Sequence, residues 1–157
     1  MEYHKDLHAE GALPVPPGFA MPSRLRAIWK RGSLEAGSVA VHVSMNDYLL
    51  HRLVDVARVG LEGLRFRRDW PRTEGAVGLW VASFKCGFRQ VSVSVWRSPE
   101  DLQLFVRSPA HLRIMREFKN VGALYTNTWT AERCDPALIW HQALDRLNGR
   151  IEGVAHH

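Results

Sequence analysis

The sequence predicts an α+β fold in which four strands form one antiparallel sheet and helices pack against it. Hydrophobic residues make up 46% and charged residues 24% of the 157 positions, as is usual for a folded domain. Apolar and polar residues alternate in short segments, and apolar residues recur at helical spacing between those segments. The segments follow the order β-α-β-β-α-β and then an extra helix, which is the ferredoxin-like pattern.

The first strand and helix are predicted from the stretch that begins at Val39. Val39, Val41 and Val43 alternate with smaller or polar residues, which indicates a strand. Asn46 or Asp47 is suited to cap the helix that follows. The apolar residues that share one face of that helix are Leu50, Leu53, Val54, Ala57, Leu61 and Leu64. We expect this face to point toward the sheet.

Two further strands and a broken helix come next. Segments 77–86 and 89–96 predict a hairpin. Ser98 is suited to cap a helix whose first position is Pro99, and acidic residues follow in its first turn. Because proline cannot donate a backbone hydrogen bond, Ser108-Pro109 breaks or kinks this helix before it continues to Phe118.

The remaining elements complete one domain. Segment 123–130 predicts the fourth strand, and Asp135-Pro136 opens a last helix that Asn148-Gly149 ends. We expect a mobile proline-rich arm at 1–22, a single ligand-binding domain at 23–150 and a disordered tail at 151–157. Segment 24–31 is either a short helical turn or an edge strand. A sheet with helices on one face leaves its other face open, so we expect a homodimer.

Composition excludes several classes of function. The net charge of +5 is spread over scattered arginines. The densest group, Arg65 to Arg68, lies where a helix ends and cations are favoured, so we expect no nucleic-acid partner. No apolar run has the length of a membrane span, and the first residues lack a signal-peptide core, so we expect a cytoplasmic protein. Cys86 and Cys134 lie far apart and are expected to be reduced thiols without a metal.

Three residues around the second helix carry a resemblance to a known family. Trp96 ends a strand, Phe105 lies in the second turn of the capped helix and His111 follows the break, in the spacing W-x8-F-x5-H. The stretch from Val77 to Thr130 resembles the dimeric α/β-barrel superfamily. Within it, the stretch looks most like the spheroidene monooxygenase-like proteins, and less closely like the antibiotic-biosynthesis monooxygenases and the heme-degrading oxygenases.

The resemblance implies a ferredoxin-like dimer with a hydrophobic ligand, often aromatic or polyenic, between sheet and helices. The reaction it implies is oxygenation, with heme in some members and no cofactor in others. The ligand histidine of the heme-degrading enzymes lies one turn beyond His111, where this chain has Met115. Their helical tryptophan is replaced by Phe105. Degradation of heme is therefore not expected, whereas heme binding through His111 stays open.

The residues themselves leave alternatives open. His111 is either an axial heme ligand, or a general base, or a histidine bonded to backbone that Ser108-Pro109 frees. Asn127 either donates to an oxyanion or satisfies a neighbour. A row of polar and aromatic side chains is expected on one face of the sheet, where it lines either a pocket or the contact with a partner subunit. Its members are His42, Ser92, Ser94, Tyr125, Asn127 and Trp129, with Trp96 at its end.

The function expected from these observations is a small monooxygenase-type enzyme acting on a hydrophobic or aromatic molecule. His111 and His42 are its expected acid, base or metal-binding groups, and Asn127 its oxyanion donor. The expected pocket residues are Trp96, Phe105, Met115, Tyr125, Trp129, Ser92 and Ser94. The alternatives are a heme-independent lyase, cyclase or isomerase that uses histidine as a proton shuttle, and a non-catalytic protein that binds heme or another hydrophobic ligand.

Overall fold

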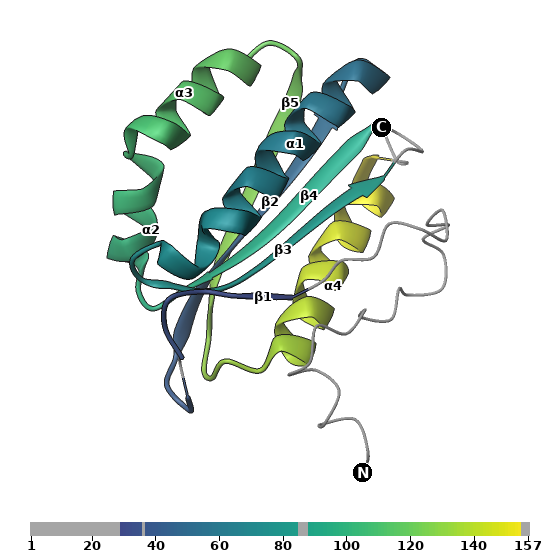
Figure 1. The fold of residues 1–157 in the computed structure, drawn as a ribbon. Coiled ribbons are helices and arrows are strands. Elements are labelled where there is room, and N and C mark those ends of the chain that lie inside the picture. Colours follow the sequence, from purple (N-terminus) through teal and green to yellow (C-terminus); the bar gives the residue numbers. More distant parts are fainter. Residues whose placement is uncertain (1–28, 36, 85–87, 155–157) are drawn as a thin grey trace.

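Five antiparallel strands form one sheet in the order β1-β3-β4-β2-β5, with helices on both faces (Figure 1). The computed structural model describes residues 29–35, 37–84 and 88–154. The elements are β1 Lys30–Arg31, β2 Val41–Leu50, α1 Leu53–Asp69, η1 Trp70–Arg72, β3 Ala76–Phe84, β4 Arg89–Trp96, α2 Pro99–Val106, α3 Pro109–Phe118, β5 Gly122–Ala131 and α4 Pro136–Val154. This is the predicted ferredoxin-like order, with β1 as an added edge strand.

Strand β2 continues beyond the predicted end of the first strand. Asn46 and Asp47 were expected to cap a helix, and that expectation is wrong. Both residues lie inside β2, which is paired with β4 on one side and β5 on the other as far as Leu49. Two-sided pairing satisfies the backbone of a central strand, so no helix competes for it. The helix begins only at Leu53.

The helix starts predicted at Ser98 and Asp135 are confirmed, and Ser108, predicted only as part of a break, caps a helix as well. The Ser98 hydroxyl accepts from the Asp101 amide, and the Ser108 hydroxyl accepts from the His111 amide. The Leu138 amide donates to Asp135 at 3.2 Å. Because Ser108 caps a new helix, the predicted break at Pro109 separates α2 from α3.

Helix α4 does not end at Asn148-Gly149 as predicted. It continues to Val154, into the segment expected to be a tail. Glycine ends a helix when it adopts a left-handed conformation, and Gly149 is not among the described glycines with positive φ. The predicted N-terminal arm at 1–22 and Cys86 lie outside the described residues. Cys134 is a half-buried free thiol whose pKa burial raises to about 11.

Helix α4 covers the sheet face that was expected to be open. Its residues Ile139, Trp140, Ala143, Leu144 and Leu147 are buried in one core with the odd-numbered side chains of β2 and β4. The Trp140 and Trp80 rings lie 5.4 Å apart, centroid to centroid. The expectation of an uncovered face is therefore wrong, because the extra helix supplies the missing apolar layer. Dimerisation stays a prediction, but it is no longer needed to cover this face.

Helix α1 is rotated relative to the prediction. Its buried residues are Asp55, Val56 and Glu62, whereas Leu53, Val54, Ala57, Leu61 and Leu64 are exposed. A Cβ added to Gly63 would lie 2.8 Å from Val81, so this glycine permits the helix to approach β3 closely. The apolar face expected to point inward points outward. No helix in the described part of the chain has the length and apolar character that crossing a bilayer requires.

Candidate functional site

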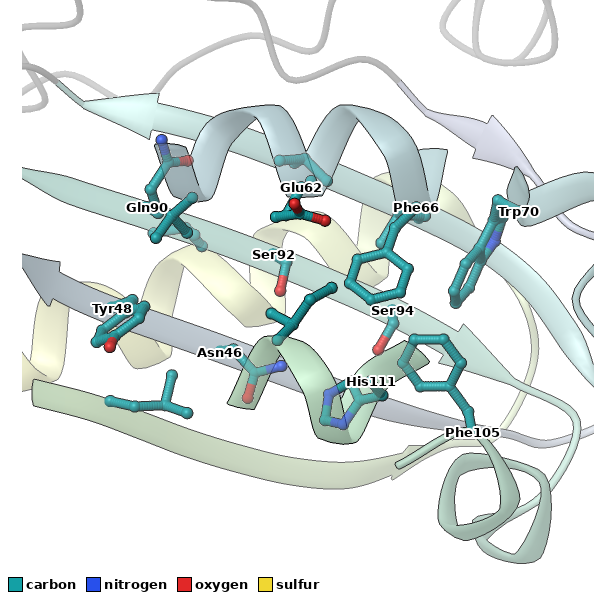
Figure 2. Close-up of a pocket in the computed structure, with 17 residues that line it drawn as sticks. Asn46, Tyr48, Glu62, Phe66, Trp70, Gln90, Ser92, Ser94, Phe105 and His111 are labelled. Atoms are coloured by element: carbon teal, nitrogen blue, oxygen red, sulfur yellow. The ribbon is translucent and has the colours of Figure 1, made fainter. Parts of the chain in front are cut away.

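A cavity lies between the sheet and the helices α1, α2 and α3. Its main part has a volume of about 530 Å³, and a neighbouring hollow of about 150 Å³ shares several lining residues with it. Strands β2, β4 and β5 supply its floor, and α1 and α3 supply its walls (Figure 2). The core on this side of the sheet is small and centred on Trp70, Trp96 and Leu102, so the space above the strands is not filled. Ligand sites in proteins are usually hollows of this size.

His111 lies at the start of α3 and lines both parts of the cavity. Its Nδ1 lies 3.1 Å from the Val106 carbonyl oxygen, which only accepts hydrogen bonds. The proton of the neutral ring is therefore on Nδ1, and Nε2 keeps a lone pair. Burial lowers the pKa of His111 below its ordinary 6.5, against the opposing effect of the Val106 carbonyl. A neutral imidazole with a bare Nε2 is equipped to accept a proton or bind a metal.

Asn46 projects from β2 into the same cavity. Thr126 of β5 donates its hydroxyl hydrogen to Asn46 Oδ1 at 2.8 Å. That bond fixes the amide and leaves its Nδ2 hydrogens for a ligand. Figure 2 shows the amide nitrogen of Asn46 on the side of His111. A hydrogen-bond donor beside a neutral base suits a substrate oxygen that becomes negative when a proton leaves.

Aromatic side chains close one end of the cavity. Phe66 and Phe105 lie 5.3 Å apart in an edge-to-face arrangement, and Phe105 lies 5.1 Å from the His111 ring. Trp70 packs edge-on against Trp96 at 4.9 Å. The buried Trp70 Nε1 has no hydrogen-bond partner among the described residues. This end of the site therefore favours a flat apolar ligand.

Ionic bonds join α1 to α3 along the side of the cavity. The buried Glu62 carboxylate of α1 accepts from Arg65 on its own helix and from Arg113 of α3 at 3.2 Å. Arg58 of α1 donates to Glu117 of α3, also at 3.2 Å. We refer to the two interhelical pairs, Glu62–Arg113 and Arg58–Glu117, as the ionic bridge. It joins α3 to α1 beside the cavity.

Two polar residues anchor the surrounding helices. Gln90 of β4 accepts from Ser83 at 2.7 Å and donates to the Val56 carbonyl of α1 at 2.8 Å. The Tyr48 hydroxyl donates to the Phe118 carbonyl at the end of α3. Burial raises the pKa of Tyr48, and the Asp55 charge adds to that shift. Because both side chains also line the hollow, they limit where its walls can move.

The structure brings together five of the predicted site residues. Ser92, Ser94, Phe105, Met115 and His111 all line the cavity. The buried Ser94 hydroxyl accepts from Trp96 Nε1 at 2.9 Å and donates to the Ser44 carbonyl at 3.2 Å, so its bonding groups are occupied by the protein. Ser92 lines the hollow beside Val81.

Strand β5, the fourth predicted strand, presents the other set of its alternating side chains to the cavity face of the sheet. Asn46 is paired with Thr126, and Met45 with Asn127. Tyr125, Asn127 and Trp129 therefore lie on the opposite face, where Trp129 Nε1 donates to Gln142 of α4 at 2.9 Å. The expectation that these three share the face of His42 is corrected, because a shift of one residue moves every side chain of a strand to the other face.

His42 and Trp96 lie on the cavity side of the sheet but outside the cavity. They are cross-strand partners at the end of β2 and β4. Trp96 is fully buried in the core below α2. The buried Nδ1 of His42 has no hydrogen-bond partner among the described residues. Neither side chain lines the space that contains His111.

Sequence reasoning missed several lining residues, of which Asn46 is the most important. The alternation of His42 and Ser44 continues through Asn46 and Tyr48, and extending that pattern would have found both. Glu62 and Phe66 carry no such signal, because the apolar pattern of α1 indicates the wrong inward face. In the described part of the chain, no group of three or more histidine, cysteine, aspartate or glutamate side chains is arranged to hold a metal ion.

Comparison with known proteins shows the fold. SnoaB, a cofactor-independent oxygenase from Streptomyces nogalater, is 15% identical and has a TM-score of 0.50; the match covers 62% of this chain and 99% of that one. A candidate antibiotic biosynthesis monooxygenase from Deinococcus radiodurans is 11% identical, with a TM-score of 0.53 over 60% of this chain and 95% of that one. The predicted resemblance to the antibiotic-biosynthesis monooxygenase-like proteins is thereby confirmed as a shared ferredoxin-like fold.

A longer structure is similar over about half its length. A candidate monooxygenase from Lactobacillus acidophilus is 10% identical, with a TM-score of 0.52, and the match covers 69% of this chain and 53% of that one. No protein-family model and no curated protein matches this chain. At these identities the similarity shows the fold alone, because one fold can carry many different chemistries.

Proposed function

We propose that this chain is a monooxygenase-type enzyme that acts on a flat, hydrophobic molecule with an acidic C–H or phenolic O–H group. The observation that supports it is that a neutral histidine base, His111, and an amide donor, Asn46, line one cavity with aromatic walls. The names of the similar structures, several of them monooxygenases, agree with this chemistry.

In the proposed reaction the protein moves protons and stabilises charge. His111 Nε2 accepts a proton from the substrate, and Asn46 Nδ2 donates to the oxygen that becomes negative. The resulting carbanion is electron-rich and adds O2 to give a peroxide, which takes a proton back from His111. Loss of water then leaves a carbonyl where the substrate had CH2. The balance is CH2 + O2 giving C=O + H2O, with no further reductant.

The test uses anthrone, a tricyclic ketone with an acidic CH2 group. With the purified protein we expect O2 consumption equal to the anthrone converted to anthraquinone, above the rate without protein. His111→Ala should abolish this excess rate. An unchanged rate in His111→Ala would contradict the proposed base. Conversion of a ligand without O2 uptake would instead indicate the lyase, cyclase or isomerase alternative.

Heme binding is the second candidate function, and one observation favours it. Metal-ligating histidines usually donate their other ring N–H to a backbone carbonyl or carboxylate, as His111 does to Val106. When bound, heme would supply the oxygen chemistry, and His111 would hold it through Nε2. An absorption spectrum recorded with added hemin tests this: a Soret band that His111→Ala weakens supports heme binding, and an unchanged spectrum of free hemin opposes it.

A further inference from the structure

The cavity continues into the hollow between α1 and the sheet, and the two parts meet at the proposed reacting groups. His111 and Asn46 line both the main part and the hollow. Trp70, Leu79 and Val91 line only the hollow and are buried. A space of about 150 Å³ holds a ring the size of benzene. A fused aromatic ligand that reacts between His111 and Asn46 therefore has room for one further ring in the hollow.

One charged side chain lies among the apolar walls of the hollow. Glu62 lines the hollow but not the main part, and its side chain is only 8% exposed. Arg65 donates to Glu62 Oε1, and Arg113 donates to Oε2. A carboxylate oxygen has two lone pairs, so each oxygen keeps the capacity for one further donor. Because two guanidinium groups already balance the carboxylate charge, a neutral hydrogen-bond donor suits this position better than a cation.

Ser92 of β4 supplies a second polar group in the hollow. Its side chain is half-buried, and its hydroxyl bonds to no other residue in the described part of the chain. Figure 2 shows Glu62 on α1 and Ser92 on the sheet below it, on facing walls of the hollow. Ser94, two positions along the same strand, differs because Trp96 and Ser44 occupy its hydroxyl. The hollow therefore offers an acceptor on one wall and a hydroxyl that can donate on the other.

We propose that the hollow is a second binding site, in which Glu62 and Ser92 select a ligand ring that carries a hydroxyl group. A hydroxyl can donate to Glu62 and accept from Ser92 at the same time. An ether or ketone oxygen cannot donate, and it would face the carboxylate without a proton between them. This inference rests on the proposed function for the class of ligand, and it adds the substituent that the ligand carries away from its reacting carbon.

Equilibrium binding of substituted anthraquinones tests the hollow without any turnover, because these compounds lack the reactive CH2 group. We expect 2-hydroxyanthraquinone to bind the full chain about tenfold more tightly than 2-methoxyanthraquinone. Quenching of tryptophan fluorescence measures both dissociation constants, in mildly acidic buffer where the phenol keeps its proton. The matched probe is 1-hydroxyanthraquinone, whose hydroxyl is bonded to its own neighbouring carbonyl. It should bind no more tightly than 2-methoxyanthraquinone.

Two pairs of variants identify the groups responsible. Glu62→Gln replaces the carboxylate by an amide and should bring the two dissociation constants within about twofold of each other. Its control, Arg113→Gln, breaks the same interhelical ion pair but keeps the carboxylate, so it should keep the preference for the hydroxyl. Ser92→Ala should weaken binding of 2-hydroxyanthraquinone about fivefold. Its control, Ser44→Ala, changes a serine of the main part of the cavity and should leave this binding unchanged.

Several results would overturn the proposal. It fails if 2-hydroxyanthraquinone and 2-methoxyanthraquinone bind equally, or if no probe binds saturably. It also fails if Glu62→Gln keeps the full preference, or if Arg113→Gln loses as much of it as Glu62→Gln does. Should Glu62→Gln not fold, Ser92→Ala decides, and unchanged binding of 2-hydroxyanthraquinone in that variant overturns the proposal.

Oxygen uptake with anthrone separates this proposal from the proposed function, since anthrone has no hydroxyl group on its outer rings. A preference for the hydroxyl without anthrone oxidation would overturn the proposed function and support the second binding site. Anthrone oxidation without that preference would overturn the second binding site and leave the proposed function supported.

Discussion

Two asparagines on neighbouring strands give the sharpest test at the level of single residues. Asn46 lines the cavity, whereas Asn127, one register position away on β5, projects from the other face of the sheet. If Asn46 stabilises a developing oxyanion, Asn46→Ala should lower kcat for anthrone by about 10²-fold. Asn127→Ala is the matched control and should leave kcat unchanged. Equal kcat values in the two variants would show that the amide is not used.

The pH dependence of the reaction should report the state of His111. The base works when neutral, and burial lowers its pKa below the ordinary 6.5. The logarithm of kcat/KM should therefore be flat near neutral pH and fall only below 6.5, as the ring becomes protonated. Stopped-flow oxidation of anthrone between mildly acidic and neutral pH measures this. An acid limb above 6.5 would be inconsistent with a buried neutral His111.

At the level of the element, we expect the ionic bonds between α1 and α3 to stabilise α3. Arg113→Gln removes the bonds of this residue to Glu62 and Glu117, and leaves Glu62 paired with Arg65. We expect backbone amides of α3 to exchange faster and stability to fall by about 0.5–1 kcal/mol, with part of the difference lost at high salt. Hydrogen exchange measured by mass spectrometry tests this.

The control for this prediction lies on the same helix. Arg116 donates to the Leu112 carbonyl of α3 at 3.2 Å and takes no part in the ionic bridge. Arg116→Gln changes the charge by the same amount, so it should leave amide exchange in α3 nearly unchanged. Equal acceleration in both variants would mean that net charge, and not the bridge, controls α3.

The elements also show what the sequence could predict. Local signals succeeded: Ser98 and Asp135 cap helices because their side chains accept nearby amides, whatever the rest of the fold does. Asn46 failed as a cap because pairing of β2 on both sides overrode its local preference. The prediction of the inward face of α1 failed because two other features decide the rotation of this helix. They are the close approach to β3 at Gly63 and the pairing of Asp55 with two arginines, and neither follows from the spacing of apolar residues.

The candidate site was predictable to the extent that it depends on local signals. His111 and Phe105 were found because a capped helix and its break place them. Asn127 was assigned to the cavity face and Asn46 was not, because the register of β5 against β2 is set by contacts far apart in the sequence. The ionic bridge was not predicted for the same reason, since Glu62 and Arg113 come from helices on either side of a hairpin.

At the level of the whole molecule, the two faces of the sheet have different roles. The α4 side holds the larger core cluster, in which Trp80 and Trp140 are buried. The α1 and α3 side has a small core and the cavity. We infer that packing against α4 supplies most of the stability, which lets the other side remain hollow.

This division predicts that stability and activity can be changed separately. Trp140→Ala removes a buried ring that contacts Trp80 and should lower the free energy of unfolding by about 3–5 kcal/mol. His141→Ala, at an exposed position of the same helix, should change it by less than about 0.5 kcal/mol. Urea titration followed by circular dichroism measures both values. Below its unfolding temperature, Trp140→Ala should keep the kcat of the unchanged chain, because the substitution lies across the sheet from His111. A large loss of kcat in a folded Trp140→Ala variant would show that the two faces are coupled.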